Sequence, residues 1–431
     1  MGGRRRSRPR TRYPEHRNGS IATRSGPWIL PLNNPAESTR NPPSKRLLLL
    51  LVALTAAAPV ALQIFLPALP ALQNYFGVST GVAQYTLTFS IVANAFATLG
   101  YGPLSDRFGR RPVLIGGLVL FVVGSFAAVA AQSIGTLVFA RVLQAAGAAS
   151  GMVLARAILR DLYDTEQAAR AIAYLTMAMV VAPMIAPTIG AVLVDVLGWR
   201  SVFVALSLFA LLLLAWSIKH LIETRPYDPR RRNGAGLVKG AALLAARPLF
   251  VSYTLQSTFA ISMFFSFLAG APYFMVNVLG RTATEYGLYF IMVSGSYMFG
   301  NFVSARLVRR VGIYRLIVTG CSLTLCGALT SAALMFSGVW APLSLFAPVA
   351  LAAIGNGLSI PNSMAGAMSI NRDLAGTASG LLGFTQMLFS AIVSQWVGEL
   401  QNGTPFPMVI FMSICAALSL IGFLLHKAIG R

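Results

Sequence analysis

The feature that most constrains this chain is a series of apolar segments, each long enough to cross a lipid bilayer. A helix of about 20 apolar residues spans the hydrocarbon core, which is ~30 Å thick. With 56% hydrophobic and 11% charged residues, the chain is not an ordinary globular protein. We expect an all-α polytopic membrane protein with twelve transmembrane helices, at about 47–66, 82–102, 112–131, 135–155, 170–193, 200–218, 249–271, 286–305, 314–335, 341–361, 376–397 and 406–426.

Lysine and arginine gather on one side of the predicted membrane. When the N-terminus is placed in the cytoplasm, 31 of the 34 Lys and Arg fall in the N-terminal tail, the cytoplasmic loops or the C-terminus. The outer loops then hold only Arg200 and Arg281. This bias predicts that both termini are cytoplasmic. The net charge of +22 therefore reflects topology, and we expect no nucleic-acid partner.

The chain divides into two halves of equal helix number. Residues 304–310 match residues 105–111 without a gap, 199 positions later, which indicates a duplicated unit. The predicted parts are a disordered basic tail (1–44), an N-terminal six-helix bundle (45–218), a cytoplasmic linker (219–248) and a C-terminal six-helix bundle (249–431).

A short polar segment, residues 102–111, separates the second and third spans. Asp106 is one of only twelve acidic residues and closes a predicted helix at the membrane surface. Gly102, one turn earlier, is expected to let a neighbouring helix approach, and Gly109 to permit the reversal into the next span. An acid among arginines can join an inter-helix charge pair that holds one conformation shut. The predicted gating residues are Gly102, Asp106, Arg107, Gly109, Arg110 and Arg111.

Arg141 is the only charge well inside a predicted span. Its insertion costs at least about 2.5–3.5 kcal/mol, so it should face the protein interior and have a partner. Gln144 lies one turn further on the same face. One interpretation is a cavity residue that binds substrate or responds to proton movement; the other is a structural arginine bonded to helix carbonyls. Together with Gln63 and Gln256, these two residues form the predicted substrate or coupling cavity.

The fifth span carries small residues at every fourth position, which lets a partner helix pack at close range. Two prolines four residues apart remove backbone donors and bend the helix. The predicted hinge residues are Ala182, Pro183, Ala186, Pro187 and Gly190. A packing kink without a role in coupling is the alternative. In the seventh span, aromatic and methionine side chains are expected to line an apolar cavity, with half of them facing lipid: Met263, Phe264, Phe265, Phe267, Tyr273 and Phe274.

The pattern Gly102-x-Leu104-x-Asp106-Arg107-x-Gly109-Arg110-Arg111 resembles the signature between the second and third helices of the major facilitator superfamily. Further motifs resemble its drug:proton antiporter branch and the Bcr/CflA drug-resistance subfamily: Leu66-Pro67-Ala68-Leu69-Pro70, Arg141-x-x-Gln144-x-x-Gly147, Ala182-Pro183-x-x-Ala186-Pro187-x-x-Gly190, Gly198-Trp199-Arg200, Pro361-Asn362 and Ala375-Gly376-Thr377-Ala378-Ser379. The similarity runs from about residue 47 to 427.

This resemblance implies two pseudo-symmetric six-helix bundles and alternating access around a central cavity. It also implies a monomeric inner-membrane exporter of small drug-like molecules, driven by proton antiport. The expected partners are the substrate, the bilayer and protons, with no cofactor and no metal. The segment at Ala182–Gly190 corresponds to the antiporter motif, which is thought to shape a hinge and block leak.

Gln63 departs from the subfamily, in which the first helix usually carries an aspartate near this point. A glutamine cannot titrate, and no Asp or Glu lies near the middle of a predicted span. The alternative is therefore a facilitator, or a carrier for a neutral or anionic metabolite, without proton antiport. A rival from another class, a membrane-embedded enzyme, has little support because the sequence carries no cluster of His, Asp, Glu or Cys for metal or nucleophilic chemistry. A non-transporting sensor that uses the basic tail has equally little support.

Overall fold

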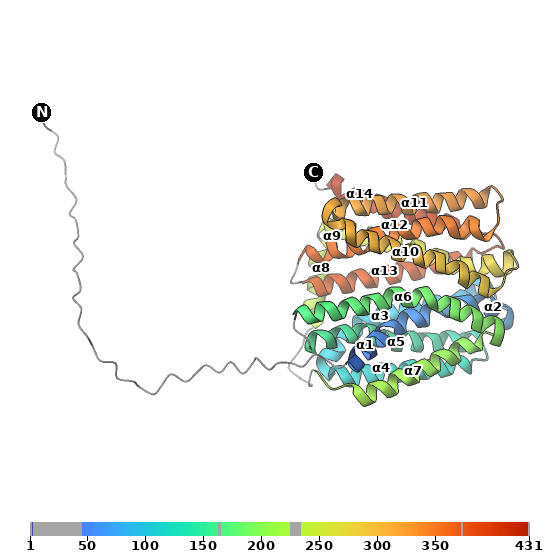
Figure 1. Cartoon of the computed structure of the whole chain (residues 1–431), viewed down its shortest axis with the longest axis horizontal. Coiled ribbons are helices and arrows are strands. Elements are labelled where there is room, and N and C mark those ends of the chain that lie inside the picture. The colour runs from blue at the N-terminus through green and yellow to red at the C-terminus, as the bar shows by residue number, and fades with distance from the viewer. Residues whose placement is uncertain (1, 3–44, 163–164, 225–233, 372–373, 430–431) are drawn as a thin grey trace. The chain divides into compact units, whose positions relative to one another are not determined.

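The computed structural model describes residues 2, 45–162, 165–224, 234–371 and 374–429. The predicted disordered tail, apart from Gly2, and residues 225–233 of the predicted linker lie outside these ranges. Within them, twelve helices of 19 to 33 residues run alongside one another (Figure 1). They are α1 (Lys45–Gln63), α3 (Thr80–Phe108), α4 (Arg110–Val129), α5 (Ile134–Leu162), α6 (Thr165–Leu197), α7 (Arg200–His220), α9 (Pro248–Tyr273), α10 (Ala283–Val311), α11 (Ile313–Phe336), α12 (Pro342–Ser369), α13 (Ala375–Glu399) and α14 (Phe406–Ile429).

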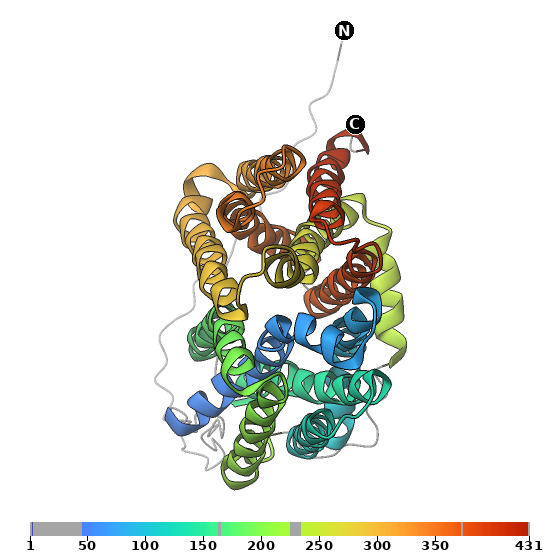
Figure 2. The same cartoon turned by 90° about the vertical axis from the view of Figure 1, so that its right-hand side faces the viewer.

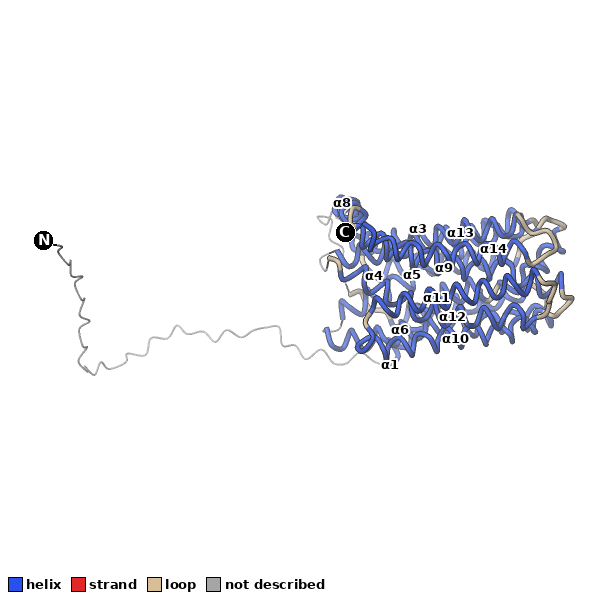
Figure 3. Tube along the Cα trace, turned by 90° about the horizontal axis from the view of Figure 1, so that it is seen from above, coloured by secondary structure: helices blue, strands red, loops and turns tan. Residues whose placement is uncertain are grey.

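The all-α membrane architecture predicted from the sequence is confirmed. Among the described residues, ten helical spans are both long enough and apolar enough to cross a bilayer. Figure 2 looks along the helices and shows the first-half helices, blue to green, on one side and the second-half helices, yellow to red, on the other. Figure 3 shows a shorter helix, α8 (Gly234–Ala245), at one end of the long helices.

The first span is longer than predicted and is bent. After α1, the chain continues through a 3-10 turn, η1 (Leu66–Ala68), into α2 (Leu69–Phe76). Pro67 and Pro70 each stand in the first turn of the element that follows the break, where a missing N–H is tolerated. The prediction that this span ends near residue 66 was wrong, because each proline lies in the first turn of a new helical element and the apolar span continues to Phe76.

The internal repeat has a spacing of 203 residues. Both α3 and α10 contain 29 residues, and their first residues, Thr80 and Ala283, are 203 positions apart. The turns that follow them are alike: Gly109 has φ 97° and ψ 155°, and Gly312 has φ 84° and ψ 154°. The predicted spacing of 199 was therefore wrong by four residues. Four residues are about one helical turn, so the misaligned stretches still present similar faces.

With the spacing of 203 residues, the counterpart of Asp106 in the second half is Arg309. The spacing of 199 residues would have made it Ala305. The turn geometry explains why both reversals use glycine, because a positive φ is costly for a residue with a side chain. The prediction that Gly109 permits the reversal is thus confirmed.

Small residues allow the closest contacts between helices. A Cβ on Gly147 of α5 would lie 2.6 Å from the Gly117 carbonyl oxygen of α4, and one on Gly151 would lie 3.0 Å from the Leu54 carbonyl carbon of α1. Gly102 behaves differently, since a Cβ there would meet nothing within 4 Å among the described residues. The prediction of close helix approach at Gly102 was therefore wrong: its surroundings are open.

Candidate functional site

The two ends of the helical bundle differ in charge. We call one the basic end; it contains the turns at Gly109 and Gly312 and the helix α8. We call the other the far end; it contains α2 and the turns at Gly198 and Gly280. The predicted gating residues lie at the basic end, and the predicted cavity and hinge residues lie between the two ends.

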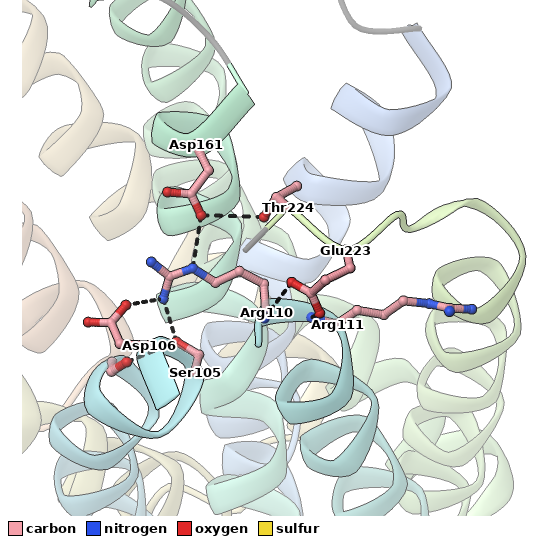
Figure 4. A network of polar contacts seen from close by, with 8 residues as sticks. Ser105, Asp106, Arg110, Arg111, Asp161, Glu223 and Thr224 are labelled. Carbon is pink, nitrogen blue, oxygen red and sulfur yellow. Dashed lines mark hydrogen bonds and ion pairs between the residues drawn. The ribbon is translucent and has the colours of Figure 1, made fainter. Parts of the chain in front are cut away.

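Arg110 is the centre of a polar network at the basic end (Figure 4). Its side chain is only 5% exposed, and it pairs with two carboxylates. Nη1 lies 2.8 Å from Asp106 Oδ1 at the end of α3, and Nε lies 3.0 Å from Asp161 Oδ2 at the end of α5. Nη1 also donates to Ser105 Oγ. One guanidinium therefore ties the ends of α3 and α5 to the start of α4, and its fixed fork of donors suits this geometry.

Glu223 attaches the segment after α7 to the same network. Its two carboxylate oxygens accept the backbone N–H groups of Arg110 and Arg111, at 2.9 and 3.0 Å. These are first-turn donors of α4, which have no partner within the helix, and the helix dipole favours a negative charge there. Thr224 donates to Asp161 at 3.3 Å, and Arg111 Nη2 donates to the Ile218 carbonyl of α7 at 3.0 Å. Four elements of the first half thus meet at one network.

The structure brings together most of the predicted gating residues in this network, but it leaves Arg107 outside it. Asp106, Arg110 and Arg111 belong to the network, and Gly102 contributes a carbonyl that accepts from Ser105 at 2.9 Å. Arg107 is exposed and lies over the Phe108 ring, 5.1 Å from its centroid. Their gating role remains a prediction.

Asp161 and Glu223 were missed by the reading of the sequence. A signal for them existed, because the chain has only twelve acidic residues and each of these two follows a predicted span on the basic side. What the sequence did not show is that the turn at Gly109 directs Arg110 toward both segments.

Arg141 is fully buried between helices of the first half. Its Nη1 donates to the Ala61 carbonyl of α1 at 3.0 Å and to the Gln144 side chain. Its guanidinium carbon lies 4.2 Å from the Phe65 ring centroid, a cation–π distance. Gln144 in turn donates to Ser125 of α4 at 2.9 Å. Nε and Nη2 of Arg141 have no hydrogen-bond partner among the described residues.

The other predicted cavity residues lie in separate surroundings. Gln63 is the last residue of α1, and its buried Oε1 accepts no hydrogen bond from a described residue. Gln256 is fully buried in the second half, where Nε2 donates to Cys321 Sγ and Ser419 Oγ, both at 3.3 Å. Arg141 and Gln256 therefore each contact helices of their own half. That the four predicted residues, Gln63, Arg141, Gln144 and Gln256, line one substrate cavity stays a prediction.

The predicted hinge segment forms part of one continuous helix, α6. Gly190 is buried, and a Cβ there would lie 2.7 Å from the Ile64 carbonyl carbon, just after α1. Ala186 and Pro187 are also buried, Ala182 is half-buried, and the side chain of Pro183 lies outside the described part. The close packing expected of the small residues is confirmed at Gly190, and the hinge role stays a prediction.

The aromatic segment of the seventh span packs into the second half. Five of its six side chains are at most 8% exposed and Phe264 is half-buried, so the expectation that half face lipid was wrong. Phe267 stacks on Phe290 of α10 at 6.3 Å between centroids and meets Phe346 of α12 edge-on at 5.5 Å. Rings from three helices fill this core, which explains their burial.

Comparisons with known proteins agree with this architecture. The family model described as Major Facilitator Superfamily matches residues 51–394. The chain is 31% identical over 349 residues to multidrug resistance protein D of Escherichia coli, covering 81% of this chain and 87% of that protein. It is 26% identical over 379 residues to the bicyclomycin resistance protein homolog of Haemophilus influenzae, covering 87% and 94%.

A solved structure has the same fold. A bacterial homolog of the human lysosomal transporter Spinster, in an inward-facing and occupied conformation, matches with a TM-score of 0.71 at 18% sequence identity. The match covers 87% of this chain and 96% of that one. With the family match over most of the sequence, it follows that this chain belongs to the major facilitator superfamily and is a multi-pass membrane transporter, not an enzyme.

Proposed function

We propose that this protein exports small drug-like molecules across the inner membrane by alternating access, with its basic end and both termini in the cytoplasm. The observation that carries the proposal is where the two halves are joined. Every hydrogen bond between described residues of different halves lies toward the far end, as in Gln84 to Ser394 at 2.9 Å and Thr88 to Gln395 at 2.7 Å. A chain joined in this way is closed at the far end.

The basic-end network supports the same proposal. Arg110 and Glu223 fasten α3, α4, α5 and the segment after α7 into one body. A half that is rigid at its end can rock against the other half without unfolding locally. The names of the relatives from Escherichia coli and Haemophilus influenzae, which refer to drug resistance, support a drug-like substrate.

Two experiments test the function. A pump-deficient host that expresses the chain should become less susceptible to several drug-like compounds, and unchanged susceptibility across a broad panel would contradict export. We propose that the driving force is proton antiport. Purified protein in proteoliposomes should then accumulate substrate only when a pH gradient is imposed, and equal flux without the gradient would rule out antiport.

A second candidate is a facilitator or a carrier of a neutral or anionic metabolite, without proton antiport. The observation in its favour is Gln63, which cannot exchange a proton. Among the residues whose side chains are described, the acids lie at the two ends of the bundle: Asp106, Asp161, Asp195, Glu223, Glu285 and Glu399. The same proteoliposome measurement distinguishes this candidate, which predicts flux that does not depend on the gradient.

Replacing Asp106 by asparagine should lower transport several-fold while leaving the amount of protein in the membrane largely unchanged. The asparagine loses the ion pair with Arg110, but Asp161 still pairs with that arginine. Because the Asp106 side chain is 29% exposed, the loss of stability should be small, on the order of 1 kcal/mol. Drug resistance and membrane abundance, measured on the same cells, check this. Undiminished resistance would refute a gating role for Asp106.

Replacing Arg141 by methionine should keep the protein folded but reduce transport at least about tenfold. Methionine removes the desolvation penalty of a buried charge that is only partly hydrogen-bonded, which offsets the loss of the bonds to the Ala61 carbonyl and to Gln144. Thermal unfolding of the purified variant tests the first part and proteoliposome flux the second. Wild-type flux would instead assign Arg141 a structural role. Arg200→Met, at a half-buried arginine of the far end, is the control for loss of a positive charge.

A further inference from the structure

Two carboxylates lie at the far end, one at each of the two places where helices of different halves meet, which we call seams. The first is Asp195, in the last turn of α6. Its Oδ2 accepts the backbone N–H of Thr284 at 2.7 Å and the hydroxyl of the same residue at 2.6 Å. Thr282 is the N-cap of α10, so the Thr284 N–H is one of the first-turn donors that lack a partner within the helix. A carboxylate of the first half thus caps a helix of the second half.

The second is Glu399, the last residue of α13. Its carboxylate lies directly over Gly81, in the first turn of α3, where Oε1 is 2.8 Å from the position that a Cβ of Gly81 would occupy. Gln395 bridges the two elements, because its Nε2 donates to Glu399 Oε1 at 2.8 Å and to the Gly81 carbonyl at 3.0 Å. Glu399 also interacts with the Tyr85 hydroxyl of α3. Here a carboxylate of the second half lies at the start of a helix of the first half.

The two seams are equivalent in the internal repeat. Thr284 and Gly81 are 203 positions apart, which is the spacing of the repeat, and Ser79 caps α3 as Thr282 caps α10. Asp195 and Glu399 are 204 positions apart, each at the C-terminal end of its helix. The pseudo-two-fold relation therefore places a negative charge at each of two helix N-termini, where the helix dipole favours it.

The other charges of the far end are directed elsewhere. Arg281 lies 3.8 Å from Glu285, four residues further along the chain. Arg200 donates to the Val129 and Ala131 carbonyls and to the Tyr75 hydroxyl. Of the titratable groups beside the two carboxylates, Tyr85 on α3 interacts with Glu399, and Glu285, which follows Thr284 on α10, pairs with Arg281 of its own half. Within the described ranges neither Asp195 nor Glu399 forms a salt bridge, and both are exposed to solvent.

We propose that Asp195 and Glu399 form a proton-sensitive latch, which we call the far-end latch, so that acidification of the compartment at the far end favours opening at that end. It rests on the alternating access proposed above. Protonation removes the charge that each helix N-terminus stabilises and weakens the hydrogen bonds that each carboxylate accepts, because ionised acceptors bind more strongly. Both effects act in the closed state, since opening separates α6 from α10 and α3 from α13.

Spin labels on Val196 of α6 and Leu288 of α10, both exposed, would report the far-end distance in a chain whose exposed Cys326 has been changed to serine. In purified protein without substrate, the far-end-open population should rise as the pH falls from about 7 to about 3, a range that crosses the ordinary carboxyl pKa values of about 3.9 for Asp and about 4.3 for Glu. Asp195→Asn and Glu399→Gln should each raise that population about two- to fivefold at neutral pH. The double variant should lose the response to pH.

Glu285→Gln is the matched control, because it removes a far-end carboxylate that pairs within its own half, and it should keep the wild-type response. Thr284→Val keeps both carboxylates but loses one bond of the latch, and it should shift the population in the same direction as Asp195→Asn. A double variant that responds to pH as the wild type does would overturn the latch, as would a far end that opens in no variant at any pH. Failure of drug export alone would contradict the proposed function and leave the distance result standing.

Discussion

Replacing Gly190 by alanine should markedly lower the stability of the protein and the amount of folded protein in the membrane. The new Cβ would collide with the carbonyl oxygen of Ile64 and lie 2.7 Å from its carbonyl carbon, and both are backbone atoms that cannot turn aside. Alanine is otherwise the better helix residue by roughly 1 kcal/mol, so only the collision can make this change harmful. Overpacking of a close contact, with the backbone shifts that it forces, typically costs about 1–3 kcal/mol and occasionally more. Size-exclusion chromatography and thermal unfolding of detergent-solubilised protein measure the loss.

Gly116→Ala is the matched control. Gly116 lies in α4, is exposed, and would place its Cβ more than 4 Å from any neighbouring described atom. This variant should accumulate and unfold like the wild type. Equal stability of the Gly190 and Gly116 variants would show that α6 does not pack on the end of α1 as described.

Replacing Arg110 by leucine should abolish transport and destabilise the first half. The change leaves the carboxylates of Asp106 and Asp161 without their shared cation, and it removes the donor to Ser105. Breaking a buried pair by removing one partner costs about 3–5 kcal/mol. Because the two carboxylates are 29% and 22% exposed, we expect a loss toward the lower end of that range. Thermal unfolding and resistance in the same host measure the two effects.

Arg110→Lys should recover part of the stability, because an ammonium keeps the charge but lacks the fork that reaches two carboxylates and a hydroxyl. Arg107→Ala, in the same segment, should cost little stability, since Arg107 is exposed and contacts the Phe108 ring. If the leucine variant at Arg110 were as stable and active as the alanine variant at Arg107, the network would not hold the basic end together.

The membrane architecture could be predicted well from the sequence because it depends on local properties. Apolar runs of about 20 residues must form helices in lipid, where every backbone polar group needs a partner within the segment. The turn at Gly109 was predictable for the same reason, since positive φ is a property of one residue. Predictions that depended on alignment or on a neighbour were less secure: the spacing of the repeat was wrong by one turn, and no described residue packs on Gly102, although the close packing at Gly190 was predicted correctly.

The candidate site could be predicted only in part. The polar segment at 102–111 pointed to the basic end, but not to Arg110 as its centre or to Asp161 and Glu223 as its partners, which come from α5 and from beyond α7. Likewise, the position of Arg141 in an apolar run showed that burying its charge costs free energy. Its hydrogen bond to the Ala61 carbonyl and its contact with Phe65 could not be predicted, because they depend on how α1 packs on α5.

The sequence by itself thus determined that this chain is a helical membrane protein of two related halves and that it carries the motif of its superfamily. Hydrophobicity, helix length and turn residues act along the chain, so they can be read from it. The tertiary structure alone decided which charges meet, which glycines separate touching helices, and that Asp195 and Glu399 reach helix starts in the opposite half. Such contacts join residues far apart in the chain, as with Arg110 and Asp161 (51 positions) or Gly81 and Glu399 (318 positions). Hydrogen bonds and ion pairs act over a few ångströms, so only the fold creates these contacts.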